Sequence, residues 1–84
     1  SHIPFKIKKV EWKHIGIIHS DAPMELEHCS MMLIALAGEI TIQIMEEGTL
    51  RLTRPNQALI LREACKSSII DSTEHSLLLT IYQK

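Results

Sequence analysis

The sequence lacks features that would assign it to several large classes of protein. It has no excess of charge, because 9 basic and 10 acidic side chains leave a formal net charge of -1. Nothing therefore favours a polyanionic partner, and we expect no binding to nucleic acid. Its two cysteines, Cys29 and Cys65, match no zinc motif and are too few for a disulfide scaffold. Reduced thiols are the rule in the cytosol, so we expect a cytoplasmic protein.

Long hydrophobic runs are also missing. The longest apolar stretch covers residues 31–37, far fewer than the about 20 residues that a membrane helix needs. We find no signal peptide, linker, repeat or low-complexity segment. We therefore expect no membrane association. We also expect a single domain over residues 1–84, which stands alone or forms one domain or a fragment of a larger protein.

The chain is rich in hydrophobic residues for its size. They make up 45% of the 84 residues, and a domain this small has a large surface for its volume. One small core cannot easily cover so much apolar surface. We therefore expect self-association.

Apolar residues recur at every second position, which is the period of a β-strand and not of a helix. Ile40, Ile42 and Ile44 show this pattern clearly. An acidic hairpin at residues 46–48 follows them, and Gly48 is expected to supply a positive φ there. The pattern predicts about eight short strands. The nine candidate segments for them are residues 3–8, 12–19, 24–29, 31–37, 39–45, 49–53, 58–61, 68–70 and 76–82. Strands and turns at this spacing predict an all-β barrel or sandwich.

A histidine in the third of these segments stands out. If residues 24–29 form a regular strand, Met24, Leu26 and His28 share one face, which is expected to point inward. Two interpretations stay open for His28. It is either an acid/base or sugar-binding group inside the barrel, or an ordinary packed histidine that is hydrogen-bonded to Ser30 or to a backbone carbonyl.

A metal site is not expected. A catalytic metal needs about three protein ligands, but His28 has no second histidine two residues further on. His14 and His19 are five residues apart and would face opposite sides of a strand, and His75 lies in a predicted turn. We therefore expect no metal and no cofactor, and a metal-dependent enzyme ranks last among the hypotheses.

The order of several segments resembles a known family. The chain contains, in this order, IPFKIKKV, LIALAGEITIQI, a Glu-Gly hairpin, LTRPNQALIL and DSTEHSLLLTIY. This order is similar to the small cupins of the WxcM-like type, the FdtA- and QdtA-type sugar 3,4-ketoisomerases. The most specific part of the resemblance is Arg54-Pro55-Asn56 with Ala58 and Leu59 behind it.

The resemblance implies a fold, a partner and a reaction. The fold is a cupin-like jelly-roll barrel, usually paired as a homodimer by strand exchange. The reaction moves a keto group from C4 to C3 of a dTDP-4-keto-6-deoxy sugar. It is a step in polysaccharide biosynthesis. A proton is removed beside the carbonyl and returned to the neighbouring carbon, and the family uses a His-x-His strand for this purpose.

Carried over residue by residue, the resemblance assigns His28 to the first histidine of that pair, and Ser30 takes the place of the second. Glu25 and Leu26 stand where the family has Arg-Gly. The implied catalytic residue is His28, and the implied substrate-binding residue is Arg54. The alternative is a non-catalytic cupin that serves as a carbohydrate- or nucleotide-sugar-binding or dimerisation module, so whether the chain is an enzyme stays open.

Overall fold

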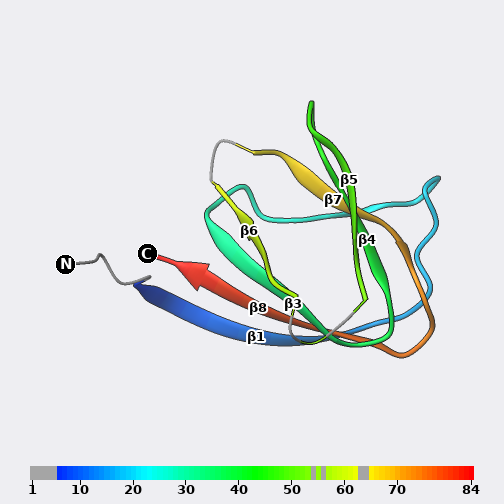
Figure 1. Ribbon diagram of the computed structural model, residues 1–84, viewed down its shortest axis with the longest axis horizontal. Coiled ribbons are helices and arrows are strands. Elements are labelled where there is room, and N and C mark those ends of the chain that lie inside the picture. The colour runs from blue at the N-terminus through cyan, green and yellow to red at the C-terminus, as the bar shows by residue number, and fades with distance from the viewer. Residues whose placement is uncertain (1–5, 54, 56, 63–64) are drawn as a thin grey trace.

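The fold consists of two antiparallel four-stranded sheets packed face to face (Figure 1). The computed structural model describes residues 6–53, 55, 57–62 and 65–84. Within them the strands are β1 (Ile7–Ile15), β2 (Met24–Glu25), β3 (Met31–Ala37), β4 (Ile40–Ile44), β5 (Gly48–Leu52), β6 (Leu59–Leu61), β7 (Ser67–Ser72) and β8 (Ser76–Gln83). These residues form no helix, so they contain no helix able to cross a membrane.

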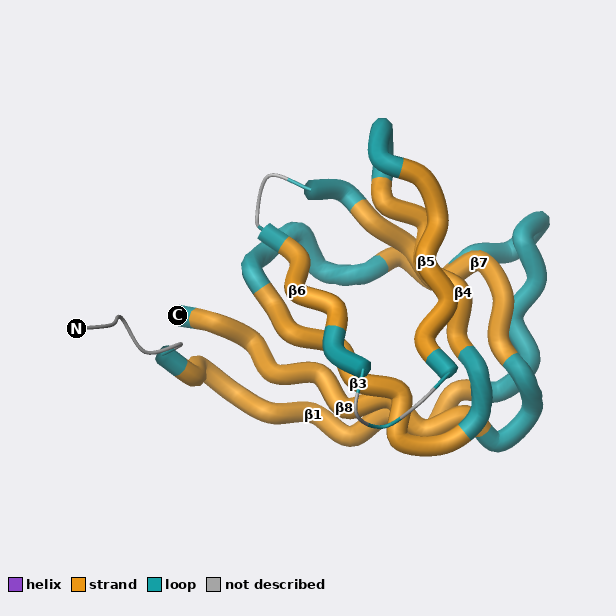
Figure 2. The backbone as a smooth tube through the Cα atoms, viewed as in Figure 1, coloured by secondary structure: helices purple, strands orange, loops and turns teal. Residues whose placement is uncertain are grey.

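The chain moves repeatedly between the two sheets. The first sheet has the strand order β1-β8-β3-β6 and the second has the order β2-β7-β4-β5. Only β4 and β5 are neighbours both in sequence and within one sheet, and every other connection crosses to the opposite sheet, as Figure 2 shows. This is a small jelly roll, and the predicted all-β, cupin-like fold class is confirmed.

The core lies between the sheets and follows the alternation that the sequence predicts. On β8, Leu78, Thr80 and Tyr82 are buried and the residues between them are only partly covered. Strands of both sheets contribute to the core. Its buried apolar members are Ile15, Ile18, Met31, Leu33, Ala35, Ile40, Ile42, Leu52, Leu61, Ile69, Leu78 and Tyr82.

The hairpin between β4 and β5 forms where the sequence places it. Gly48 has a φ of 112° and Glu46 a φ of 70°. The expected positive φ at Gly48 is therefore confirmed. The hairpin also fixes the β4–β5 register, in which Ile44 pairs with Gly48 and Ile40 with Leu52.

Two predictions near the start of the chain were wrong. Residues 7–15 form one strand and not parts of two, because β8 is long enough to pair with β1 along its whole length. Residues 1–5 lie outside the described part. The segment 24–29 is a strand only at Met24 and Glu25, which pair with β7 in the second sheet. The chain must then leave that sheet, because β3 belongs to the first sheet.

Candidate functional site

Four polar side chains gather on the inner face of the first sheet, where β1 begins and β8 ends. Lys9 of β1 pairs with Tyr82 of β8, and Tyr82 pairs in turn with the buried Met31 of β3. Paired residues of antiparallel strands point to the same face, so Lys9 and Tyr82 both face inward. Glu11, two residues after Lys9, shares that face, and Glu27 reaches it from the segment between β2 and β3.

These four residues, called the inner polar cluster below, are joined by short contacts. The Tyr82 hydroxyl donates a hydrogen bond of 2.8 Å to Oε1 of Glu11. The Nζ of Lys9 lies 3.8 Å from a carboxylate oxygen of Glu11 and 3.7 Å from one of Glu27. It also lies 4.6 Å from the centre of the Tyr82 ring, at the distance of a cation–π contact. The cluster thus ties the β2–β3 segment to the first sheet.

The cluster shifts the pKa values of two of its members in opposite directions. Burial of the phenol raises the pKa of Tyr82, and the carboxylates of Glu11 and Glu27 raise it further. The hydrogen bond from Tyr82 lowers the pKa of Glu11, with partial opposition from burial and further lowering by Lys9 and Lys13. At neutral pH the phenol is therefore neutral and Glu11 is ionised. Both groups titrate away from neutrality, so they are better suited to hydrogen-bonding hydroxyl groups than to transferring protons at pH 7.

The titration of Tyr82 tests this geometry directly, since the chain has one tyrosine. We expect the tyrosinate absorbance of the folded protein to appear only well above the ordinary phenol pKa of about 10, with the ordinary value returning in denaturant. Because the folded pKa is raised, this contribution to stability is complete below about pH 10 and is lost at higher pH. The variant Glu11→Gln should move the folded titration back toward the ordinary value. A folded titration near pH 10 in the unmodified protein would show that the cluster does not hold the phenol.

The structure does not place His28 inside the barrel. His28 is exposed and lies in a bend that directly follows Glu27. The expectation that it shares an inward strand face with Met24 and Leu26 was wrong, because the strand ends at Glu25. The space between the sheets is filled by the apolar core. Arg54, the expected substrate-binding residue, lies outside the described residues.

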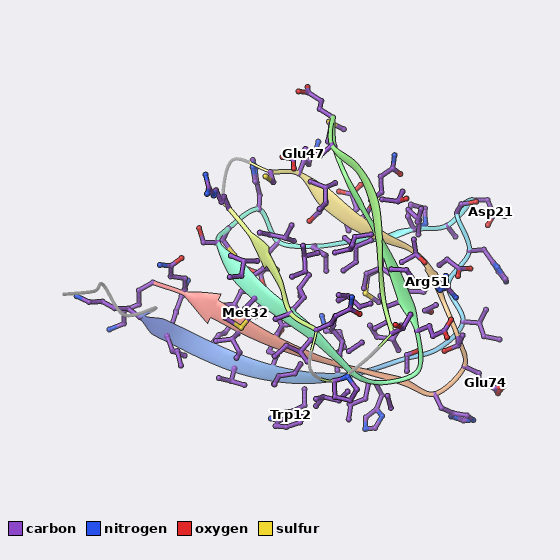
Figure 3. All side chains as sticks on the ribbon, viewed as in Figure 1. Trp12, Asp21, Met32, Glu47, Arg51 and Glu74 are labelled. Atoms are coloured by element: carbon purple, nitrogen blue, oxygen red, sulfur yellow. The ribbon has the colours of Figure 1, made fainter. Side chains whose placement is uncertain are left out.

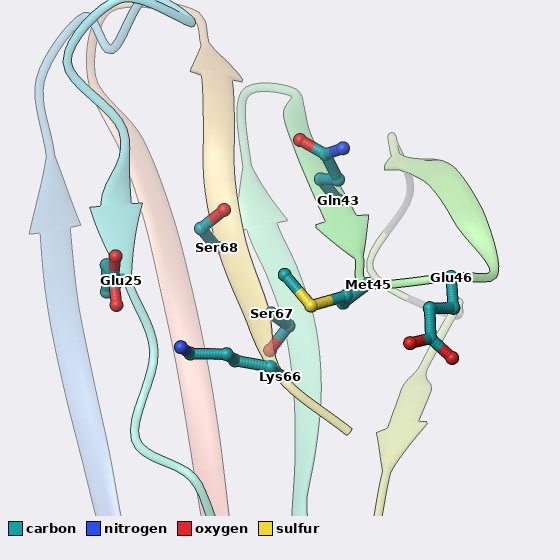
Figure 4. Close-up of a pocket in the computed structure, with 7 residues that line it drawn as sticks. All are labelled: Glu25, Gln43, Met45, Glu46, Lys66, Ser67 and Ser68. Atoms are coloured by element: carbon teal, nitrogen blue, oxygen red, sulfur yellow. The ribbon is translucent and has the colours of Figure 1, made fainter.

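A pocket of about 240 Å³ opens on the outer face of the second sheet (Figure 4). Gln43 of β4 pairs with Ser68 of β7, and both point away from the buried Ile42 and Ile69 beside them. Lys66 lies among them and makes no ion pair within the described part of the chain. The lining residues are Glu25, Gln43, Met45, Glu46, Lys66, Ser67 and Ser68. Sequence reasoning missed this pocket because three separate segments build it and no local motif marks it.

The same outer face carries a second polar group. The guanidinium of Arg51 on β5 donates to Oε1 of Glu39, at 2.8 Å from Nη2 and 3.0 Å from Nε. It also donates to Asp71 of β7 at 3.1 Å and to Thr41 of β4. These bonds thus go to β4, to β7 and to Glu39, which directly precedes β4. Arg51 therefore serves to hold three strands together and is not free to bind a ligand.

The described residues contain no group of three or more His, Cys, Asp or Glu side chains placed to hold a metal ion. Cys29 and Cys65 are both in the thiol form. The Sγ of Cys65 lies 3.8 Å from a carboxylate oxygen of Glu47. The two cysteines therefore form no disulfide.

Comparison with known proteins gives one informative match. No family model and no curated protein sequence matches the chain. Among solved structures, the chain matches the QdtA 3,4-ketoisomerase from Thermoanaerobacterium thermosaccharolyticum, a double mutant in complex with TDP. The TM-score is 0.80 at 26% sequence identity, over 98% of this chain and 62% of that one. The chain thus spans about three fifths of the length of that enzyme.

This match agrees with the order of segments found in the sequence. The similarity of fold extends over 98% of this chain, which includes all of those segments. The resemblance predicted from the sequence is confirmed: over nearly its whole length, this chain is similar to the QdtA-type sugar 3,4-ketoisomerases.

Proposed function

We propose that this chain is a nucleotide-sugar-binding cupin of the 3,4-ketoisomerase class, and that its ligand is a dTDP-linked 4-keto-6-deoxy sugar. The observation that carries the proposal is the similarity of fold to a ketoisomerase solved with TDP. We place the protein in the cytoplasm, as a single domain in polysaccharide biosynthesis. Two cysteines that form no disulfide with each other support that compartment.

The side chains suit two parts of the ligand: the inner polar cluster suits the sugar, and an arginine suits the diphosphate. Glu11 and Glu27 accept hydrogen bonds from sugar hydroxyls, and Lys9 donates to a carbonyl or hydroxyl oxygen. Two carboxylates around one ammonium group do not favour a diphosphate. We therefore assign the diphosphate to Arg54, because a guanidinium pairs with phosphate oxygens through two parallel hydrogen bonds.

Binding without turnover is the activity that the arrangement supports best. Ketone migration needs a group that both accepts and returns a proton near neutral pH. Glu11 and Tyr82 have pKa values shifted away from that range. His28 is the nearest histidine in sequence to the inner polar cluster, but it is exposed in a bend. The apolar filling of the barrel leaves the mouth of the barrel, and not its centre, for the ligand.

Calorimetric titration with TDP tests the binding proposal. We expect the unmodified protein to bind TDP. The variant Arg54→Met should bind it at least about tenfold more weakly, because it loses one charge-assisted hydrogen bond to the diphosphate. Arg62→Met is the matched control, since Arg62 is an exposed arginine to which the proposal assigns no contact with the ligand, and it should bind normally. Lys66→Met reports on the outer pocket. No heat from TDP, or a loss confined to Lys66→Met, would contradict the proposal.

The ketoisomerase reaction is the second candidate, favoured by the activity of the structural relative. Its catalytic residue would be His28. Nuclear magnetic resonance detects the 3-keto product formed from dTDP-4-keto-6-deoxyglucose. The matched control is His19→Asn. If the unmodified protein and His19→Asn form the product but His28→Asn does not, the function is catalysis and not binding alone.

A further inference from the structure

The pocket on the outer face of the second sheet takes no part in the function proposed above. Three charged side chains line it, those of Glu25, Glu46 and Lys66. None of them makes an ion pair or a side-chain hydrogen bond within the part of the chain that the structure describes. Arg51 differs, because neighbouring side chains bond its guanidinium fully, and Figure 3 shows it well away from the hairpin where Glu47 is labelled. The same face thus carries one polar group that is satisfied and one that is not, and the second surrounds a hollow.

Backbone pairing holds the walls of this pocket in place. The N–H of Met45 donates a hydrogen bond of 2.8 Å to the carbonyl of Lys66, which fastens the end of β4 to the start of β7. Ser68 of β7 pairs with Glu25 of β2 on one side and with Gln43 of β4 on the other. Three neighbouring strands therefore present these side chains, and a ligand does not have to order the backbone when it binds.

Glu46 occupies a turn position that favours other residue types. A hydrogen bond of 3.0 Å from the N–H of Glu47 to the carbonyl of Ile44 closes the turn, so Glu46 is its third residue. Its φ is 70°, and glycine or asparagine adopts such a φ at this position with the least strain. A glutamate there costs stability, and no described residue bonds its carboxylate in return. A ligand that needs the carboxylate accounts for the glutamate.

The size and charge of the pocket limit what can fill it. Its volume of about 240 Å³ lies below the roughly 300–1,000 Å³ of pockets that hold drug-sized ligands. A nucleotide sugar is therefore too large, and a molecule of about ten non-hydrogen atoms is a better fit. The lining carries two carboxylates and one ammonium group, which complement a ligand with two positive groups and one negative group. A neutral sugar would leave these charges unpaired, and a phosphate would meet two carboxylates.

The charged groups stand on two sides of the pocket. In Figure 4, Lys66 extends toward the side where Glu25 lies, and Glu46 lies on the opposite side. Met45 reaches between the two sides, and it is 56% exposed. Its thioether is flexible and apolar, so it suits contact with a chain of methylene groups. The order of the pocket is therefore charge, apolar wall, charge.

We propose that this pocket binds a basic α-amino acid of the lysine type. The α-carboxylate pairs with Lys66 and the α-ammonium group with Glu25. The methylene chain lies along Met45, and the terminal ammonium group pairs with Glu46. This site is separate from the nucleotide-sugar site, and the proposal does not depend on that function.

A nuclear magnetic resonance titration of the full chain with L-lysine tests the proposal. We expect the backbone amide signals of Met45 and Lys66 to shift, with a Kd on the order of 1 mM for so small and open a site. Norleucine lacks the terminal ammonium group, cadaverine lacks the carboxylate, and Nα-acetyl-lysine lacks the α-ammonium group. Each should bind at least about tenfold more weakly, because each loses one charge-assisted contact. The acetylated ligand also separates free lysine from a lysine at the C-terminus of a protein.

Two variants and a matched control test the assigned contacts. Lys66→Met and Glu46→Asn should each weaken lysine binding at least about tenfold. Glu47→Gln is the control, since Glu47 is the neighbouring glutamate of the same hairpin and does not line the pocket. Glu46→Asn should also raise the melting temperature by about 3 °C, because asparagine suits the positive φ. A variant that is more stable and yet binds lysine more weakly cannot have lost binding through unfolding.

Three results would overturn the proposal. The first is the absence of amide shifts at lysine concentrations well above the expected Kd. The second is equal binding of lysine, norleucine and cadaverine, which would show that the charges are not recognised. The third is lysine binding that survives both Lys66→Met and Glu46→Asn, which would place the ligand elsewhere. No nucleotide is present in these titrations, so failure of TDP binding and failure of lysine binding are seen separately.

Discussion

Replacement of Gly38 by alanine is expected to lower the free energy of unfolding by about 3 kcal/mol, the sum of backbone strain and overpacking. Gly38 follows β3 and has a φ of 75°, a conformation that residues with a Cβ adopt only under strain. The space is closed as well. An added Cβ would lie 2.9 Å from the backbone Cα of Ser76 and 2.8 Å from Oγ1 of Thr73.

The neighbours of Gly38 cannot easily move aside. The Thr73 hydroxyl accepts a hydrogen bond of 2.9 Å from the backbone N–H of Glu39. The Ser76 hydroxyl donates one of 2.7 Å to the carbonyl of Thr73, and Ser76 is fully buried. Any shift that admits the Cβ therefore breaks bonds that join the β3–β4 and β7–β8 turns.

The melting temperature measures the effect. For a chain of this length, about 3 kcal/mol corresponds to a fall on the order of 15 °C. Gly16→Ala is the matched control, since Gly16 has nothing within 4 Å of an added Cβ. It should change stability by less than about 0.5 kcal/mol. Gly48→Ala adds positive-φ strain without crowding, so its loss of stability should lie between those of Gly38→Ala and Gly16→Ala. Equal stability of all three variants would show that the Gly38 turn is not closed as described.

The strands that could be predicted from sequence are those whose partners enforce the local pattern. β3 is apolar on both faces and lies in the middle of the first sheet, and its predicted bounds, 31–37, are the observed ones. The alternation on β8 is also correct, because one face meets the core. The break predicted between the first two strands was wrong, since pairing with β8 carries β1 past Glu11 without interruption.

The candidate site was harder to predict, for a physical reason. The alternation through His28 is a local pattern, but the strand ends where pairing with β7 ends, and sequence does not show the partner. The inner polar cluster joins Lys9, Glu27 and Tyr82 from three distant segments. One signal was available: Lys9 and Glu11 have the spacing of one strand face.

Replacement of Ser72 by alanine is expected to lower the free energy of unfolding by about 2 kcal/mol, because it leaves the buried backbone N–H of Ile18 without its partner. The Ser72 hydroxyl donates a hydrogen bond of 2.6 Å to the carbonyl of Gly16. It accepts one of 3.0 Å from the backbone N–H of Ile18. Ser72 and Ile18 are both buried, so water cannot easily replace these bonds.

This contact matters for the site as well as for stability. Ile18, in the segment after β1, forms a β-bridge with Ser72 of β7, and the Ser72 hydroxyl adds a side-chain bond to it. The same segment leads on to β2 and to Glu27 of the inner polar cluster. Loosening that bridge should therefore loosen the inner polar cluster. Chemical denaturation gives the loss in stability, and hydrogen exchange at the Ile18 amide shows whether it is local. Ser68→Ala, on the outward face of the same strand, should cost less than about 0.5 kcal/mol. The contrary result is that Ser72→Ala costs as little stability as Ser68→Ala and leaves the Ile18 amide protected from exchange. That result would show that the backbone bond alone holds the bridge, and that pairing with β7 alone positions β2.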